Sequence, residues 1–162
     1  MNAHMATPPR VDPSRYLHTE PMRAMLALQR AVEASGLEHG LLALVKIRAS
    51  QINGCAYCLD MHTKDARAAG ETEQRLYALA AWEEAPFFTA RERAALAWAE
   101  AVTRIADTHV PDAVHDRARE VFDEPELIAL TWALVAINGW NRLAVSFRLP
   151  AGGYEPGQLA RA

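Results

Sequence analysis

The sequence predicts an all-α protein, a bundle of six or seven helices. Apolar residues recur at helical spacing, Pro and Gly fall where helices begin or end, and no segment alternates like a half-buried strand. A chain of 162 residues, 51% of them hydrophobic, is long enough to bury one core. We therefore expect one helical domain over residues 19–150, an extended arm over 1–18 and a loose tail over 151–162.

The first half of the chain divides at glycine and proline into four expected helices. The first begins at Thr19, has Pro21 in its first turn and ends at Gly36. The second covers residues 41–53, the third runs from the cysteines to residue 70, and a short fourth covers residues 72–82. Gly54, Gly70 and Pro86 mark the ends of these three helices, because glycine and proline seldom continue a helix.

The second half is expected to hold three more helices. Thr89-Ala90-Arg91-Glu92 matches a capping box, in which the first and fourth residues satisfy each other's backbone N–H groups. Pro111 suits the first turn of the next helix, which extends to about Phe122. Asp123 then opens a long helix to about Phe147. Apolar positions occupy most of its circumference, so we expect it to be the central buried helix.

Composition and charge exclude several classes of partner. The chain has 17 basic and 20 acidic residues, a net charge of −3 and no basic block, which argues against nucleic acid or an anionic membrane. Its longest apolar stretch, near residues 127–137, is well short of the about 20 residues that cross a bilayer. No secretory signal pattern opens the chain, and its two cysteines suggest a reducing compartment, so we expect a cytoplasmic protein. Residues Met1–His4 resemble a cloning remnant ahead of Met5.

Both cysteines lie in one short segment, Ser50-Gln51-Ile52-Asn53-Gly54-Cys55-Ala56-Tyr57-Cys58-Leu59-Asp60-Met61-His62. Two thiols spaced C-x-x-C can cycle between dithiol and disulfide. If a helix begins near Cys55, then Cys58 and His62 share its face, and His62 can exchange a proton with Cys58. A helix N-terminus also favours thiolate, lowering a thiol pKa from about 8.5. The segment therefore predicts a redox dithiol with its own base.

Other interpretations of the pair fit less well. A zinc site needs a fourth ligand beside Cys55, Cys58 and His62, such as Asp65 or another histidine, and the chain has no second cysteine pair. Covalent haem attachment requires a histidine directly after the second cysteine, where the chain has Leu59. A thioredoxin would need a βαβ pattern, which is absent. A zinc site and a pair of inert buried cysteines stay open as alternatives.

The cysteine segment resembles the core of the AhpD-like alkyl hydroperoxidases, in the carboxymuconolactone decarboxylase superfamily. The resemblance continues through Thr63-Lys64-Asp65-Ala66-Arg67 and Gly70-Glu71, and returns at Ile137-Asn138-Gly139-Trp140-Asn141-Arg142-Leu143-Ala144. It covers most of residues 20–148, and the cysteine segment is its most specific part. It implies an AhpD-like helical bundle, assembled as a trimer or hexamer.

The resemblance also implies thiol-dependent reduction of alkyl hydroperoxides. By the family's pattern, Cys58 attacks the peroxide, Cys55 resolves the product as a disulfide, and His62 relays the proton of Cys58. The implied partners are a hydroperoxide substrate, a thiol or lipoylated-protein reductant, and further copies of the chain. No metal, haem, flavin or other cofactor is implied. Decarboxylases of the superfamily generally lack the cysteine pair, so the pair favours the redox branch.

The chain departs from that pattern at two positions. Similar chains carry a relay glutamate in Leu-Leu-Glu-Leu, where this chain has Leu41-Leu42-Ala43-Leu44, and Tyr57 stands where some members have a histidine. A carboxylate beside an imidazole raises its basicity and fixes its tautomer, which alanine cannot do. Three other carboxylates are candidates to replace it: Glu38, Asp60 and Asp65. We therefore expect weakened peroxidase chemistry with disulfide cycling retained.

Most other conspicuous residues are expected to be structural. The tryptophans Trp82, Trp98, Trp132 and Trp140 suit core or subunit contacts. Ser50 and Asn53 are expected to turn the chain into the cysteine helix. Asn138, Asn141 and Arg142 are expected to form a polar patch that can reach the cysteine segment or a neighbouring subunit. We assign to the solvated surface His18, His39, His109 and His115, and the group Lys64, Asp65 and Arg67.

Two other functions stay open at this point. A lactone decarboxylase or related acid–base enzyme of the same fold would use His62 alone. A non-enzymatic redox-sensing or scaffolding oligomer would use the disulfide to change its packing, and Ala43 favours this interpretation.

Overall fold

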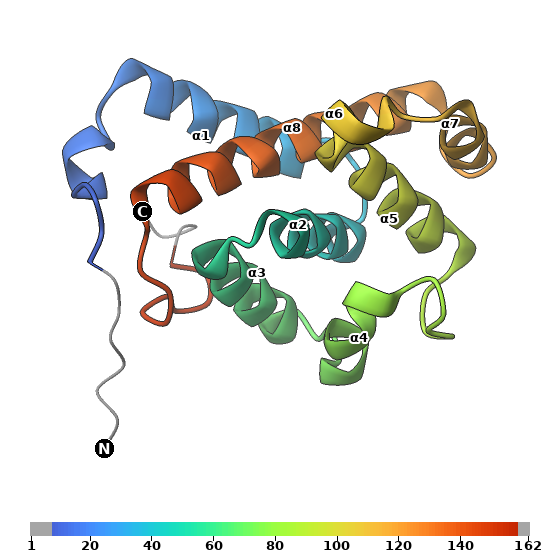
Figure 1. Cartoon of the computed structure of the whole chain (residues 1–162), viewed down its shortest axis with the longest axis horizontal. Helices are drawn as coiled ribbons and strands as arrows, with labels where there is room; N and C mark the ends of the chain where they lie inside the picture. The colour runs from blue at the N-terminus through green and yellow to red at the C-terminus, as the bar shows by residue number, and fades with distance from the viewer. Residues whose placement is uncertain (1–7, 159–162) are drawn as a thin grey trace.

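Helices are the only regular elements in residues 8–158, the part of the chain that the computed structural model describes, and they confirm the predicted all-α fold (Figure 1). In chain order they are η1 (Pro13–Tyr16), α1 (Glu20–Glu33), α2 (His39–Asn53), α3 (Ala56–Ala68), α4 (Glu73–Ala78), η2 (Leu79–Ala81), α5 (Ala90–Thr103), α6 (Ile105–Thr108), α7 (Asp112–Arg119) and α8 (Glu124–Phe147), where η marks a 3-10 helix. The ends of the expected arm and tail, residues 1–7 with the expected remnant Met1–His4, and residues 159–162, lie outside the described residues.

Helix α2 lies at the centre of the bundle, where it packs against α3, α5 and α8 (Figure 1). Its buried side chains fall all round the helix, namely Leu41, Leu42, Leu44, Val45, Lys46, Ile47, Ala49 and Ser50. A helix that buries its whole circumference is enclosed by its neighbours. The central helix is therefore α2, which carries the chain into the cysteine segment.

Helix α8 crosses the bundle with α1 beside it (Figure 1). One of its faces carries fully buried core residues such as Leu130 and Leu134. On another face Ile128, Trp132 and Val135 are each about half exposed. The expectation that this helix is the central buried one is wrong, because residues 8–158 leave this second apolar face largely uncovered.

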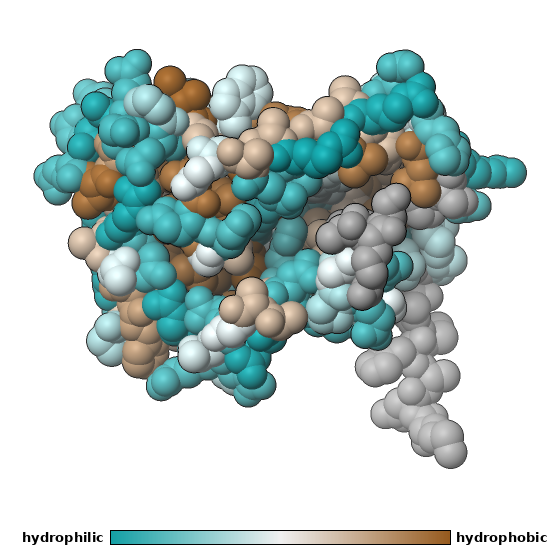
Figure 2. All heavy atoms as spheres, turned by 180° about the vertical axis from the view of Figure 1, so that it is seen from behind, coloured by the Kyte–Doolittle hydropathy of each residue, from teal (hydrophilic) through white to brown (hydrophobic). Residues whose placement is uncertain are grey.

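The apolar character of α8 is accounted for by its place in the core. By length and composition it is the one helix of residues 8–158 that could cross a membrane. The core helix of a soluble bundle meets the same criterion, and α8 packs against α1, α2, α3, α5 and α7. On the face seen in Figure 2, hydrophobic side chains lie in separate patches among hydrophilic ones.

Two capping boxes fix where α5 and α8 begin. The backbone N–H of Thr89 donates to Glu92 at 2.8 Å, and the backbone N–H of Glu92 donates to the Thr89 hydroxyl at 3.2 Å. Asp123 and Glu126 form the same reciprocal pair at the start of α8. Each box satisfies backbone donors that a helix N-terminus otherwise leaves unpaired, so the predicted box at Thr89 is confirmed.

The observed boundaries differ from expectation in short segments. The helix expected over 72–82 is α4 followed by η2, and the four-residue α6 is additional, so the described residues hold eight α-helices instead of six or seven. The first helix ends at Glu33, before Gly36, and residues 13–16 of the expected extended arm form η1. Single turns and helix ends carry little sequence signal, because few residues define them.

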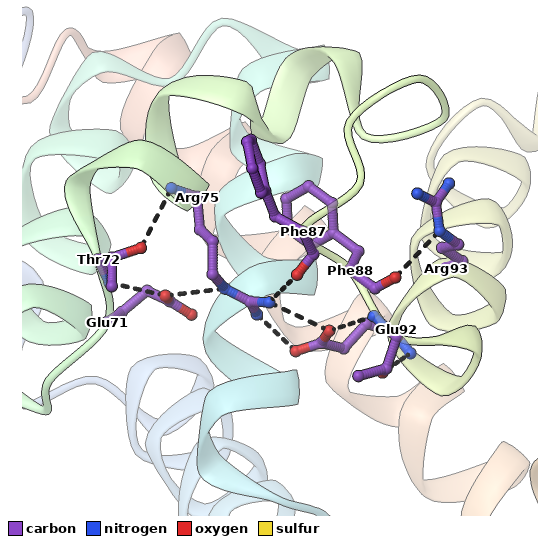
Figure 3. A network of polar contacts seen from close by, with 8 residues as sticks. Glu71, Thr72, Arg75, Phe87, Phe88, Glu92 and Arg93 are labelled. Carbon is purple, nitrogen blue, oxygen red and sulfur yellow. Dashed lines mark hydrogen bonds and ion pairs between the residues drawn. The ribbon is translucent and has the colours of Figure 1, made fainter.

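An arginine on α4 ties that helix to the start of α5 (Figure 3). Arg75 donates from Nε to Glu71 at 2.9 Å, from Nη2 to Glu92 at 2.5 Å, and from Nη1 to the carbonyl of Phe87. Its guanidinium also lies over the ring of Phe88, 4.9 Å from the ring centre. We call these five residues the Arg75 network. It holds the connection between η2 and α5 against both helices.

Candidate active site

Both cysteines lie at the N-terminus of α3, as the sequence predicts. Cys55 is the N-cap residue, and its Sγ accepts a hydrogen bond of 3.3 Å from the backbone N–H of Cys58. The two sulfurs are joined in a disulfide, with their Cα atoms 5.3 Å apart. Gly54 adopts a left-handed conformation (φ 65°) that turns the chain from α2 into α3, and glycine does so without steric cost. The local sequence thus places a disulfide-forming pair at a helix end.

The disulfide is buried. Cys55 and Cys58 are each 1% exposed, and Tyr57, Ala144 and Leu149 pack against them. Ala144 belongs to the last turns of α8, and Leu149 to the segment that follows it. A reagent can therefore reach the sulfurs only when this cover moves, which requires local opening of the structure.

His62 lies one helical turn after Cys58 on α3, so the two residues share a face of the helix. Burial, together with the positive charge of Lys46, lowers the pKa of His62 from 6.5 to about 3. The imidazole is therefore neutral at physiological pH and has a free lone pair that can accept a proton. Within residues 8–158, no carboxylate contributes to this pKa shift.

The carboxylates proposed to replace the glutamate missing at position 43 are engaged elsewhere. Glu38 forms an ion pair with Arg91, Asp60 forms one with Lys64, and Asp65 accepts hydrogen bonds from Tyr154 and Gly157. Glu38 also sits at the N-cap of α2, the end of that helix opposite the cysteines. In the described residues, His62 is thus left without the carboxylate partner that would raise its basicity.

Lys46 is a charged residue of this region that the sequence patterns did not single out. It lies on α2 one turn after Ala43 and is 7% exposed. Its Nζ lies 3.7 Å from a carboxylate oxygen of Glu33, whose side chain is half exposed. Burial lowers the pKa of Lys46, while the charges of Glu33 and Asp65 oppose this change.

A sequence signal for this buried lysine did exist. Lys46 stands between Val45 and Ile47 in a helix whose apolar residues occupy every face. In such a helix a charged residue is enclosed by the neighbouring elements unless its long chain reaches solvent.

Hydrogen bonds between α2 and α8 hold the turn that carries the cysteines. Asn53 donates from Nδ2 to Asn138 at 2.9 Å and to Asn141 at 2.8 Å. Asn141 in turn donates to the Ser50 hydroxyl at 3.0 Å. The expectation that Asn138 and Asn141 reach the cysteine segment is confirmed. Buried amides with satisfied partners fix the α2–α3 corner against α8 and have a structural role.

Residues 149–158, the C-terminal segment, are bound to α3. Tyr154 is buried and donates from its hydroxyl to both carboxylate oxygens of Asp65, at 2.9 and 3.0 Å. The backbone N–H of Gly152 donates to Asp60 at 2.9 Å. Lys64 donates to the carbonyl of Tyr154 at 2.9 Å. The expectation of a loose tail is therefore wrong for residues 151–158.

These contacts also correct the assignment of one helix face. Lys64 and Asp65 were expected to be solvated, but both are partly buried and hold the C-terminal segment. Arg67 is exposed, as expected. Because Leu149 covers the disulfide and belongs to the same segment, the bonds to α3 help to fix that cover in place.

The remaining polar and aromatic residues fall largely where expected. His18, His39, His109, His115 and Arg142 are exposed. Trp82 and Trp98 are buried, Trp140 is partly buried and Trp132 is exposed. No group of three or more His, Cys, Asp or Glu side chains in residues 8–158 could hold a metal ion. The described residues therefore offer no zinc site to the cysteine pair.

An all-helical bundle with a C-x-x-C pair at the N-terminus of a helix has the AhpD-like architecture. The sequence model of the carboxymuconolactone decarboxylase family matches residues 19–101, and the chain belongs to this family. The uncharacterized protein YdfG of Bacillus subtilis (strain 168) is 43% identical to it over 127 residues, which are 78% of this chain and 86% of YdfG.

Solved structures give the same fold. A protein of unknown function from Agrobacterium tumefaciens, suggested to be the antioxidant defence protein AhpD, superposes with a TM-score of 0.86 and 42% identity, over 91% of this chain and all of that one. The debrominase Bmp8 superposes with a TM-score of 0.74 at 20% identity, over 82% of this chain and 71% of Bmp8. The second likeness concerns the fold alone.

Proposed function

We propose that the protein is a thiol-dependent peroxidase and disulfide oxidoreductase that reduces alkyl hydroperoxides through Cys55 and Cys58. The observation that carries this assignment is the disulfide at the N-terminus of α3 with a neutral imidazole, His62, one turn away. The Agrobacterium relative at 42% identity, suggested to be an antioxidant defence protein, supports it. Because His62 lacks a carboxylate partner in the described residues, we expect slow turnover with peroxide.

In the reduced protein, the Cys58 thiol gives its proton to His62, and the thiolate attacks the terminal oxygen of the hydroperoxide. The O–O bond breaks as an S–O bond forms, and His62 passes the proton to the departing alkoxide, which leaves as the alcohol. Cys55 then attacks the sulfenic acid of Cys58, forming the disulfide and releasing water. The two sulfurs lose two electrons, and the peroxide gains them.

A thiol donor, such as a small dithiol or a lipoylated protein, returns the pair to the reduced state by giving it two electrons and two protons. Such a donor must reach a disulfide that is 1% exposed, so movement of the cover at Ala144 and Leu149 precedes its attack. A reducing cytoplasm would keep this donor available.

We further propose that the chain self-associates as a trimer or hexamer. The apolar face of α8 at Ile128, Trp132 and Val135 is half exposed, and a second copy of the chain is the partner that we propose covers it. Trp132→Glu should lower the molar mass measured by light scattering while the helical circular dichroism stays unchanged. Tyr77→Glu, at a position that is 78% exposed on α4, is the matched control and should leave the mass unchanged.

Counting free thiols tests the assignment directly. Fully reduced protein is mixed with tert-butyl hydroperoxide, and thiols are titrated over time. We expect both thiols to be lost for each peroxide consumed, Cys58→Ser to abolish the loss, and Cys55→Ser to accumulate a sulfenic acid that a dimedone probe traps. Thiol loss no faster than that of an ordinary exposed cysteine at the same pH would overturn the peroxidase and leave disulfide exchange.

A further inference from the structure

The two sulfurs of the disulfide occupy unequal positions in α3. Cys55 is the N-cap residue, and its Sγ accepts a hydrogen bond of 3.3 Å from the backbone N–H of Cys58. Cys58 is the third residue of the helix, and within residues 8–158 its Sγ accepts no hydrogen bond. Of the two sulfurs, that of Cys55 is therefore the one bonded to the N-terminal end of the helix.

The N-cap position favours negative charge on Cys55. A side chain at the N-cap accepts from backbone N–H groups that the first turn of a helix leaves without partners. The helix dipole places partial positive charge at the same end, and α3 has 13 residues over which that dipole builds up. A sulfur that accepts this hydrogen bond within a disulfide accepts a stronger one as an anion. Thiolate is therefore more stable on Cys55 than on Cys58.

Neither exposure nor the charges of α3 separate the two sulfurs. Both cysteines are 1% exposed, and the same apolar side chains pack against the pair. Burial raises the pKa of Tyr57, so its hydroxyl stays protonated, and burial lowers the pKa of His62 to about 3, so its imidazole stays neutral. Asp60 is paired with Lys64 at 3.0 Å. The first turns of α3 thus carry no unmatched charge that would oppose the helix end.

Cations on the helices packed against α3 are engaged elsewhere. On α2, Lys46 lies 3.7 Å from a carboxylate oxygen of Glu33. Arg48, on the same helix, is paired with Glu100 at 2.8 Å. On α8, Arg142 is exposed and donates to a backbone carbonyl of its own helix at 3.0 Å. The hydrogen bond at the N-cap is therefore the interaction that distinguishes one sulfur from the other.

We propose that Cys55 is the leaving group when the thiol donor reduces the disulfide, so that the sulfur of the donor becomes bonded to Cys58. The proposal rests on the disulfide exchange proposed above and assigns the sulfur at which that exchange begins. In thiol–disulfide exchange, the sulfur that forms the more stable thiolate leaves faster. Because the two sulfurs are equally buried, the leaving group decides which of them is attacked.

In the first step of this reduction, a donor thiol loses its proton to solvent and its thiolate attacks the Sγ of Cys58. The S–S bond between the cysteines breaks, and its electron pair goes to the Sγ of Cys55, where the N–H of Cys58 stabilises the charge. The second thiolate of the donor then attacks the donor sulfur bonded to Cys58. Cys58 is released and takes up a proton. The cysteine pair has gained two electrons, and the donor has become a disulfide.

The same position prepares Cys55 for the oxidative half of the cycle. A resolving sulfur attacks the sulfenic acid of Cys58 as a thiolate. The N-cap holds Cys55 in that form before peroxide arrives. The hydrogen bond from the Cys58 N–H therefore assists both the formation and the cleavage of the bond between the two sulfurs.

The first test uses the wild-type protein and locates the sulfur of the donor. Oxidised protein is mixed with reduced glutathione, quenched with acid at early times and digested with pepsin, and the peptide that holds both cysteines is sequenced by tandem mass spectrometry. Acid protonates the thiolates and stops further exchange. Glutathione on Cys58 should exceed glutathione on Cys55 by about threefold or more. Equal labelling, or an excess on Cys55, would overturn the proposal.

The second test examines each cysteine alone, and it decides the question if the wild-type mixed disulfide is too short-lived to detect. Serine is a good N-cap residue, so Cys55→Ser keeps the start of α3. Followed by thiolate absorbance, Cys55 in Cys58→Ser should ionise about one pH unit or more below Cys58 in Cys55→Ser. When each variant is loaded with glutathione, Cys58→Ser should release it to a second thiol about threefold faster or more. Equal values in the two variants would contradict the proposal.

Neither measurement uses peroxide, so failure of the proposed peroxidase would not be mistaken for failure of this inference. Slow thiol loss with tert-butyl hydroperoxide would count against the peroxidase alone. Glutathione found mainly on Cys55 would count against the assignment of the leaving group alone.

Discussion

Two cations of this protein are handled in opposite ways. Arg75 meets two carboxylates and a carbonyl, and the hydrogen bond that it donates to Glu92 leads the interactions that raise its pKa (Figure 3). Lys46 is more deeply buried, meets one half-exposed carboxylate at 3.7 Å, and has its pKa lowered by burial. Both belong to the same domain, yet one charge is matched at close range and the other is not.

The difference separates a cation that is closely paired from one that is buried and weakly paired. In the Arg75 network each hydrogen bond fixes a segment, and the charge of the arginine is neutralised by its direct partners. At Lys46 the one carboxylate of residues 8–158 within 4 Å is half exposed, and burial lowers the pKa of the lysine. Poorly matched buried charges of this kind occur where proteins tune titratable groups.

The largest effect should come from the Arg75 network. Arg75→Met removes charge-assisted hydrogen bonds to Glu71 and Glu92, whose side chains are about four-fifths buried, and leaves those carboxylates without their cation. We expect a loss of about 2–3 kcal/mol in the free energy of unfolding, measured by urea denaturation at pH 7. Glu92→Gln, which keeps the shape and part of the hydrogen bonding, should lose less. A loss below about 0.5 kcal/mol would mean that water replaces these bonds.

The pH dependence of stability should then distinguish the region of His62 from the Arg75 network. The pKa of His62 is lowered to about 3 in the folded protein, so the unfolded chain takes up the proton first as the pH falls below 6.5. The stability present above pH 6.5 is therefore lost as the pH falls. The limiting slope is about 1.4 kcal/mol per pH unit, and the free energy of unfolding drops by about 2 kcal/mol in total between pH 8 and pH 5.

His62→Gln should remove most of this loss, as urea denaturation at pH 8, 6.5 and 5 would show. Glu92 titrates at lower pH, because hydrogen bonds from Arg75 and Thr89 lower its pKa despite its partial burial. The Arg75 network should therefore weaken only below about pH 4.5, outside this range. Equal pH dependence of wild type and His62→Gln between pH 8 and pH 5 would contradict a lowered pKa of His62.

The sequence predicts the fold and the position of the cysteine pair better than it predicts the contacts around that pair. Helix starts at Thr89 and Asp123 and the turn at Gly54 follow from local chemistry, and they were predicted and observed. The docking of Tyr154 on Asp65 joins residues 89 positions apart, and no local pattern encodes such a contact. The burial of Lys46 likewise depends on how α2 packs against its neighbours. Sequence periodicity predicts which face of each helix is apolar. Which of these faces contact one another is determined by the packing of the helices.

A smaller effect is expected from the segment that covers the disulfide. Tyr154→Phe removes the hydroxyl that donates to Asp65, and a hydrogen bond to a charged group is worth about 1–2 kcal/mol. If the segment opens more often, reduction of the Cys55–Cys58 disulfide by dithiothreitol should be about fivefold faster or more. Tyr77→Phe, which removes an exposed hydroxyl bonded to Glu73, is the matched control and should leave the rate unchanged. Equal rates in all three proteins would show that the cover opens by a route independent of Tyr154.

The smallest effect on stability should come from Lys46 itself. Lys46→Met replaces a poorly paired buried cation with an apolar chain of similar length, so desolvation of the charge disappears together with one weak ion pair. We expect the free energy of unfolding at pH 7 to stay within about 1 kcal/mol of wild type, with any change toward greater stability. Arg75→Met and Lys46→Met would then differ in their free energies of unfolding, although each variant removes one positive charge. A loss of about 2 kcal/mol or more in Lys46→Met would place the lysine with Arg75 as a structural cation. A small change would mean that the fold does not depend on this buried charge.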